Sequence, residues 1–141
     1  LICATLFFGL RPPPSVGAGL AWLAVTFGAL LLAGALTQLM NISLLWTTSA
    51  EGVSRLMPTV AYFFSGMIVP LPFYPDWAQT LIAILPFRGL ADGPFRVFSG
   101  HLPLSQAPLL LAHQLGWTLL LVLLGRWLLS RATGRLAVQG G

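Results

Sequence analysis

The sequence predicts an all-α, polytopic membrane protein, and three observations support this fold class. Apolar residues make up 57% of the 141-residue chain and charged residues only 7%, whereas a typical soluble domain contains about 25% charged residues. Long apolar stretches alternate with short polar segments. A segment rich in proline and aromatic residues, 63–77, interrupts the helical pattern without adding much charge, which is typical of a membrane rim.

We interpret the chain as the C-terminal part of one transmembrane domain, with a partial helix followed by three full transmembrane helices. Residues 1–10 form an apolar run that is too short to cross a hydrocarbon core, which requires about 20 residues. The run lacks the basic start and the cleavage site of a signal peptide, so we expect it to be the end of a longer helix. Arg11 and the three prolines after it predict a connection at a membrane surface.

The first full helix is predicted over residues 16–48, where no charged residue occurs. The stretch is too short for two crossings and a turn, so we expect one tilted or protruding helix. Small residues recur along it and favour a close helix–helix contact, although such residues are also simply common in membrane helices. They are Ala21, Ala24, Gly28, Ala29 and Ala33. Gln38, Asn41 and Thr47 indicate that the second half faces other helices or a cavity.

A polar elbow separates this helix from the second full helix, which is predicted over residues 56–70. Glu51 and Arg55 are four residues apart, so on a helix they would face each other. Such a pair is more often a solvated surface contact than a functional one. We place Pro58 in the first turn of the second helix, where its missing N–H is tolerated.

Residues 71–104 predict an external hairpin that is re-entrant or lies at the membrane interface. Pro70 and Pro75 interrupt the preceding helix because proline lacks a backbone N–H. Asp76 is the expected N-cap of a short amphipathic helix that begins at Trp77.

The third full helix is predicted over residues 105–129 and is followed by a tail, 130–141. Arginines that follow an apolar span indicate the cytoplasmic side, so we predict a cytoplasmic C-terminus, an outer hairpin and an inner elbow. His113, Gln114 and Trp117 lie on one side of this helix. An ionisable group in a membrane span is a functional hypothesis, but His113 lies near the helix start and we favour a structural role for it.

The sequence carries no recognisable catalytic constellation. It contains three acidic residues, two histidines and one cysteine, and their spacing matches no metal site, catalytic triad or phosphate-binding loop. The net charge of +4 comes from scattered arginines, whereas nucleic-acid binding requires a basic patch. We therefore expect no catalytic residue, metal or cofactor on this chain and no nucleic-acid partner.

A series of motifs follows a recognisable order along nearly the whole chain. The motifs are Trp46-Thr47-Thr48, Phe64-Ser65-Gly66-Met67-Ile68-Val69-Pro70-Leu71, Pro75-Asp76-Trp77, Leu85-Pro86-Phe87, Gln114 with Trp117, and Val138-Gln139-Gly140-Gly141. In this order they resemble the ABC-2 type transporter permeases, in the branch that includes viologen-exporter-like permeases. The chain departs from that pattern at Arg88, where the branch more often has a neutral polar residue.

The resemblance implies the permease subunit of an ATP-driven exporter in the cytoplasmic membrane, moving a small cationic or amphipathic molecule. A separate ABC ATPase subunit would bind and hydrolyse ATP, and a second permease chain, identical or related, would complete the pathway. Glu51 and Arg55 would contact the ATPase subunit, and the external hairpin would cap the exit. The residues that would mark the hairpin are Pro70, Pro75, Asp76 and Trp77. The residues that would line the substrate path are Gln38, Asn41, Thr47, Tyr62 and Ser65.

Two other functional classes remain open from the sequence. A membrane-embedded lipid-modifying enzyme would use His101 or His113 with Asp92 as its acid–base groups. A non-transporting membrane scaffold would need helix packing alone.

Overall fold

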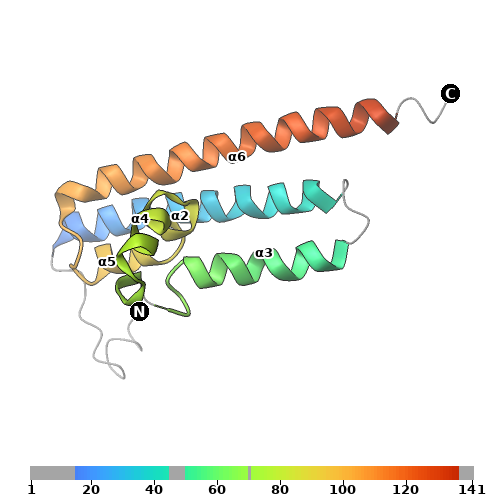
Figure 1. Cartoon of the computed structure of the whole chain (residues 1–141). Helices are drawn as coiled ribbons and strands as arrows, with labels where there is room; N and C mark the ends of the chain where they lie inside the picture. Colours follow the sequence, from blue (N-terminus) through green and yellow to red (C-terminus); the bar gives the residue numbers. More distant parts are fainter. Residues whose placement is uncertain (1–14, 45–49, 70, 137–141) are drawn as a thin grey trace, which may run out of the picture.

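The computed structural model describes residues 15–44, 50–69 and 71–136, and within these ranges every regular element is helical. The three long helices are α2 (Val16–Ser43), α3 (Ala50–Phe64) and α6 (Ala107–Leu136) (Figure 1). The all-α fold class is therefore confirmed for the described part of the chain. The partial helix expected over residues 1–10 and the residues after 136 lie outside that part.

Two helices of the described part, α2 and α6, are long and apolar enough to cross a membrane. α3 contains only 15 residues and is about 22 Å long, whereas the hydrocarbon core of a bilayer is about 30 Å thick. The prediction of three full spanning helices was therefore wrong in number. Within the most apolar 18 residues of α2 and of α6, only 28% and 17% are buried, so most of their apolar surface faces outward.

α2 and α6 run parallel and side by side (Figure 1). Their contacts advance together along both helices, because Gly28 lies against Gln114 and, further along, Ile42 lies against Gly125. Six of the seven buried residues of α2 form two rows with seven-residue spacing, and Ala29 lies outside both rows. These rows are Ala18, Val25 and Leu32, and Gly28, Ala35 and Ile42. The buried residues of α6 that continue this spacing are Ala107, Gln114 and Leu121.

We call this contact the seam. A seven-residue repeat keeps two helices in register over many turns when they wrap gently around each other, and small residues allow their backbones to approach. The predicted packing face is confirmed at Gly28 and Ala29, which are buried, but Ala24 is exposed. α2 is helical as predicted up to Ser43, and the predicted residues 45–48 lie outside the described part.

α3 begins and ends earlier than the helix predicted over residues 56–70. It starts at Ala50, so the polar elbow forms its first turns, and Pro58 lies in its interior rather than in its first turn. It ends at Phe64, and Gly66 then adopts φ 85°, the left-handed conformation that commonly terminates helices. α3 runs antiparallel to α2 (Figure 1).

The predicted hairpin consists of short helices beside the starting ends of α2 and α6 (Figure 1). They are η2 (Leu71–Phe73), α4 (Asp76–Ile84), η3 (Pro86–Gly89), α5 (Asp92–Phe98) and η4 (Leu104–Gln106). Asp76 is the first residue of α4 and not its N-cap, because Pro75 takes that position and no side chain caps the helix. The negative charge of Asp76 still lies in the first turn, where the helix dipole stabilises it.

The hairpin packs on the seam mainly through α5. Val97 of α5 is buried against Val25 of α2 and Ala107 of α6. The Trp22 and Phe98 rings add a contact, with their centroids 5.3 Å apart. At the other end of the molecule α6 extends to Leu136, so residues 130–136, which we assigned to the tail, are helical.

Candidate functional site

Gln114 joins three parts of the fold. Its side chain is fully buried, with 0% exposed, although it sits in an apolar helix. Its Nε2 donates hydrogen bonds to the backbone oxygens of Val25 in α2 (3.0 Å) and Gly89 in η3 (2.8 Å). Since a carbonyl can only accept, these partners require the nitrogen end of the amide to face them. We call this arrangement the Gln114 junction.

Two glycines make room for the Gln114 side chain. A methyl group on Gly28 would collide with the amide oxygen of Gln114 and would lie 2.8 Å from Cδ1 of Leu111. A methyl group on Gly89 would lie 3.0 Å from Cγ of Gln114 and 3.2 Å from Cδ2 of Leu32. An added methyl group would therefore collide with the amide at position 28 and would be tightly packed against the Gln114 side chain at position 89.

Two further side chains of α6 bind hairpin carbonyls. Nε1 of Trp117 donates to the oxygen of Ile84 at 2.9 Å, and Nε2 of His113 lies 3.2 Å from the oxygen of Leu85. The Leu85 carbonyl can only accept, so this contact requires a proton on Nε2 of His113. These carbonyls belong to the last residue of α4, Ile84, and to its C-cap, Leu85, where a helix leaves its last oxygens without partners. The structural role expected for His113 therefore has a geometric basis.

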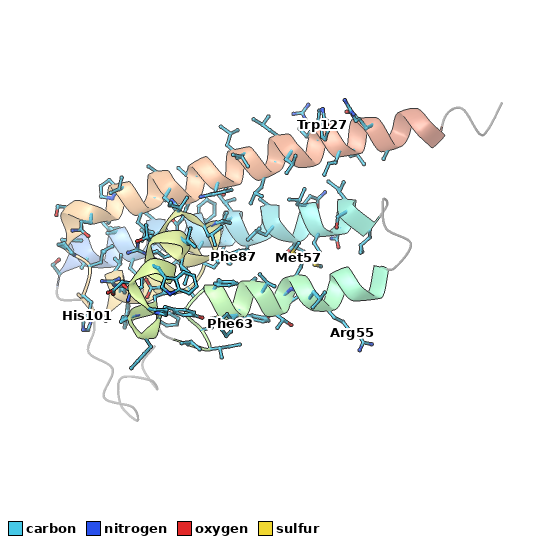
Figure 2. All side chains as sticks on the ribbon, in the orientation of Figure 1. Arg55, Met57, Phe63, Phe87, His101 and Trp127 are labelled. Carbon is cyan, nitrogen blue, oxygen red and sulfur yellow. The ribbon has the colours of Figure 1, made fainter. Side chains whose placement is uncertain are left out.

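Aromatic residues attach the hairpin to the end of α3. The hydroxyl of Tyr74 donates to the oxygen of Phe63 at 3.0 Å, and their rings pack edge to face at 5.7 Å. Phe64 stacks on Phe87 at 6.1 Å. Figure 2 shows Phe63 and Phe87 near the end of α3 where the hairpin begins. The hairpin is thus connected to all three long helices.

The hairpin carries a charged cluster formed by Arg88, Asp92 and Arg96. Oδ2 of Asp92 lies 3.8 Å from Nε of Arg88 and 3.7 Å from Nη1 of Arg96. These distances are too long for hydrogen bonds, and Oδ2 is buried without a hydrogen-bond partner. The Asp92 side chain is 13% exposed, and the arginine side chains are 34% and 39% exposed.

Burial and charge act in opposite directions on Asp92. Desolvation raises the pKa of its carboxyl group, while the positive charges of Arg96 and Arg88 lower it, and the net effect is a pKa above the ordinary value of 3.8. The carboxylate is thus not fully compensated by the two arginines.

Two cavities adjoin the charged cluster. One, of about 430 Å³, lies between the hairpin and the first turns of α6, and the other, of about 370 Å³, lies on the α4 side. Arg88 and Arg96 line both cavities, whereas Asp92 lines only the larger. Neither arginine was predicted from the sequence to be part of a site. A signal was available, because each follows a Pro-Phe pair and the two units are eight residues apart.

The residues proposed for the substrate path do not form one cluster. Gln38, Asn41 and Tyr62 are exposed, and none of them lines either of the two cavities. Ser65 is buried, with 1% exposed. Its hydroxyl donates to the oxygen of Tyr62 at 3.1 Å, and its own carbonyl accepts from the backbone nitrogen of Asp92 at 3.2 Å. Thr47 lies outside the described residues.

The residues proposed for the ATPase contact lie at the start of α3, away from the hairpin. Glu51 is in the first turn of α3, but its side chain lies outside the described part of the structure. Arg55 is exposed and extends away from the other helices (Figure 2). The i,i+4 pairing of these two residues therefore stays a prediction.

The residues proposed for the outer hairpin are exposed wherever the structure describes them. Pro75, Asp76 and Trp77 are exposed, Trp77 to 72%, and Pro70 lies outside the described residues. Among the acid–base candidates, Asp92 and His113 line the larger cavity together. His101 is exposed, and its Nδ1 lies 2.8 Å from the hydroxyl of Ser99.

No protein-family model, curated protein or solved structure matches this chain. Its function must therefore be argued from the arrangement of its own residues.

Proposed function

We propose that this chain belongs to the membrane-spanning permease of an ATP-driven exporter, in which the hairpin caps one end of the transport path. The anchoring of the hairpin on α6 carries this proposal. Trp117, which holds the end of α4, lies about 15 Å along α6 from Ala107. A hairpin held there reaches about half of a 30 Å hydrocarbon core.

The hydrogen bonds that α6 makes to the hairpin backbone support such a position. Irregular backbone is tolerated at membrane depth only where protein or a water-filled cavity satisfies its polar groups. Gln114, His113 and Trp117 supply partners for hairpin carbonyls at this level. Gln114 and Trp117, two of the residues on which the proposed resemblance rests, both hold the hairpin.

In this proposal the two ends of the molecule lie on opposite sides of the membrane. The hairpin would face the outside, and the start of α3 and the end of α6, which lie at the opposite end (Figure 1), would face the cytoplasm. A separate ATPase subunit would contact Glu51 and Arg55 and hydrolyse ATP. Its closure would drive two permease chains between inward-facing and outward-facing states. The cargo would be a small cationic or amphipathic molecule.

Cysteine labelling of the full-length permease, reconstituted with its ATPase subunit, tests this proposal without knowledge of the natural substrate. In a Cys3→Ser background, Phe73→Cys, at a site that is 80% exposed in the hairpin, is compared with Arg126→Cys near the far end of α6. We expect a membrane-impermeant maleimide to reach the two positions from opposite sides. We also expect ATP to change the labelling rate at residue 73.

The same vesicles are then used to measure ATP-dependent movement of ethidium, a cationic dye, with a hydrolysis-deficient ATPase subunit as control. Labelling of both positions from one side would contradict the topology. Constant labelling with and without ATP, together with no dye movement, would contradict the transport proposal and favour a scaffold.

A lipid-modifying enzyme is a second candidate because Asp92 and His113 line one cavity. Replacement of Asp92, His101 and His113 by alanine would then abolish activity toward membrane lipids. Unchanged function of the complex in this triple variant would rule the enzyme out.

A further inference from the structure

The larger cavity has a charged wall and an apolar wall. Arg88, Asp92 and Arg96 form the charged wall, on η3 and α5. The apolar wall is formed mainly by Leu102, which precedes η4, and by Leu109 and Leu110 in the first turn of α6. The volume of about 430 Å³ lies in the range of small-molecule sites, roughly 300–1,000 Å³. The cavity is therefore suited to a ligand with both a polar and an apolar part.

The charged wall has unused capacity to bind an anion. Each guanidinium group offers five N–H donors, and in the described part of the chain the contacts of Arg88 and Arg96 with Asp92 are 3.8 and 3.7 Å long. Two arginines facing one carboxylate leave a net positive charge. Beside an apolar wall, such a charge is costly unless a counter-ion accompanies it.

The apolar wall continues to the outer surface of the molecule. Leu109 is 74% exposed, so an apolar chain whose head occupies the cavity could continue along α6 beyond it. A soluble anion would leave this wall without a partner, whereas an anionic amphiphile would use both walls.

We infer that this cavity binds the phosphate group of an anionic phospholipid, with Arg88 and Arg96 donating to the phosphate oxygens and an acyl chain lying along Leu109 and Leu110. Arginine suits this task because its planar fork matches phosphate geometry. The inference requires this cavity, beside the first turns of α6, to lie at the level of the lipid headgroups, but it does not depend on transport.

Native mass spectrometry of the full chain in a mild non-ionic detergent tests this inference. Phosphatidylglycerol and phosphatidylcholine with identical acyl chains are titrated against the wild type and against the double variant Arg88→Gln, Arg96→Gln. We expect phosphatidylglycerol to bind the wild type about tenfold more tightly than phosphatidylcholine. The double variant should bind the two lipids with nearly equal affinity. Arg126→Gln, which removes an exposed positive charge from α6, should keep the preference for phosphatidylglycerol.

Three outcomes would overturn the inference. They are equal binding of the two lipids by the wild type, an unchanged preference in the double variant, and displacement of the lipid by inorganic phosphate alone, which would indicate a site for the free ion. Circular dichroism checks that the double variant remains helical. If it does not, the wild-type preference and the phosphate competition decide the question.

Discussion

The seam and the hairpin are held in different ways. Along the seam, α2 and α6 meet through rows of small and apolar residues spaced by seven, with Gln114 as the polar exception. The hairpin, in contrast, is held on α6 by three side chains that bind its backbone oxygens. They are Gln114, Trp117 and His113. The seam depends mainly on shape, whereas the hairpin, besides its apolar packing through α5, depends on partners for its polar backbone.

The difference follows from what each part exposes. A regular helix satisfies its own backbone, so two helices in lipid associate through close packing, without a hydrophobic driving force between them. Short helices joined by bends leave several carbonyl groups free. In an apolar environment, each free carbonyl must find a donor. The two regions meet at Gly28 and Gln114, and substitutions there can show how far each depends on the other.

The largest effect is expected for Gly28→Ala. The added methyl group would collide with the Gln114 amide and with Leu111, so it would disturb the seam and the junction together. Overpacking of this kind costs roughly 1–3 kcal/mol, and we expect the upper end because the Gln114 amide is held by two hydrogen bonds and cannot move without disturbing them. Unfolding with a denaturing detergent in mixed micelles measures the change in the free energy of unfolding.

Gly34→Ala is the matched control. Gly34 is exposed on the same helix, and an added methyl group there would meet no atom of another element within 4 Å. Alanine should be neutral or slightly stabilising at this position, because it restricts the unfolded chain. Equal losses in the two variants would mean that the seam does not require glycine at position 28.

The seam could be predicted in part because its small residues can be recognised in the sequence. Small residues indicated a packing face, and Gly28 and Ala29 are indeed buried. Ala24 was assigned to the same face because it fits a spacing of four, but it is exposed. The real contact follows a spacing of seven, which is visible only when a partner helix fixes the register.

A smaller effect is expected for Gln114→Leu, which keeps a similar volume but removes both hydrogen bonds. The Val25 oxygen lies within α2 and can keep its helical partner, whereas the Gly89 oxygen would lose the bond from Gln114. A buried polar group left without a partner costs about 1–3 kcal/mol. We expect a loss of about 2 kcal/mol in the free energy of unfolding. Amide hydrogen exchange should rise most in η3 and α5.

Gln38→Leu makes the same chemical change at an exposed site on α2, so it should leave stability within about 0.5 kcal/mol of the wild type. If exchange in Gln114→Leu rose equally along the seam and the hairpin, the hairpin would not depend separately on this side chain.

The hairpin and its charged cluster were harder to predict than the seam. The prolines correctly placed an irregular region after α3, but its attachment depends on contacts between residues far apart in sequence, such as Trp117 with Ile84. Periodicity describes one face of one helix and says nothing about which carbonyl a side chain will reach. The end of α3 was missed for a local reason, since the apolar pattern continues past Phe64 although Gly66 ends the helix.

The smallest effect on stability is expected from the titration of Asp92, which should affect the hairpin and not the distal seam. Because the net effect of burial and the two arginines raises the pKa of Asp92 above 3.8, the folded protein binds this proton more tightly than the unfolded chain. The contribution of Asp92 to stability is therefore most favourable below pH 3.8 and declines as the pH rises through the folded-state pKa. Asp92→Asn cannot titrate, so the wild type should lose stability relative to this variant as the pH rises.

Amide hydrogen exchange at several pH values, corrected for the intrinsic pH dependence of exchange, localises this effect. The difference between wild type and Asp92→Asn should appear in η3 and α5 and be absent from the distal seam around Ile42 and Gly125. The opposite trend, in which the wild type gains stability with rising pH, would mean that Arg88 and Arg96 overcompensate the burial of Asp92. That result would also weaken the case for unused anion-binding capacity in the charged cluster, because the two guanidinium groups would already interact strongly with Asp92.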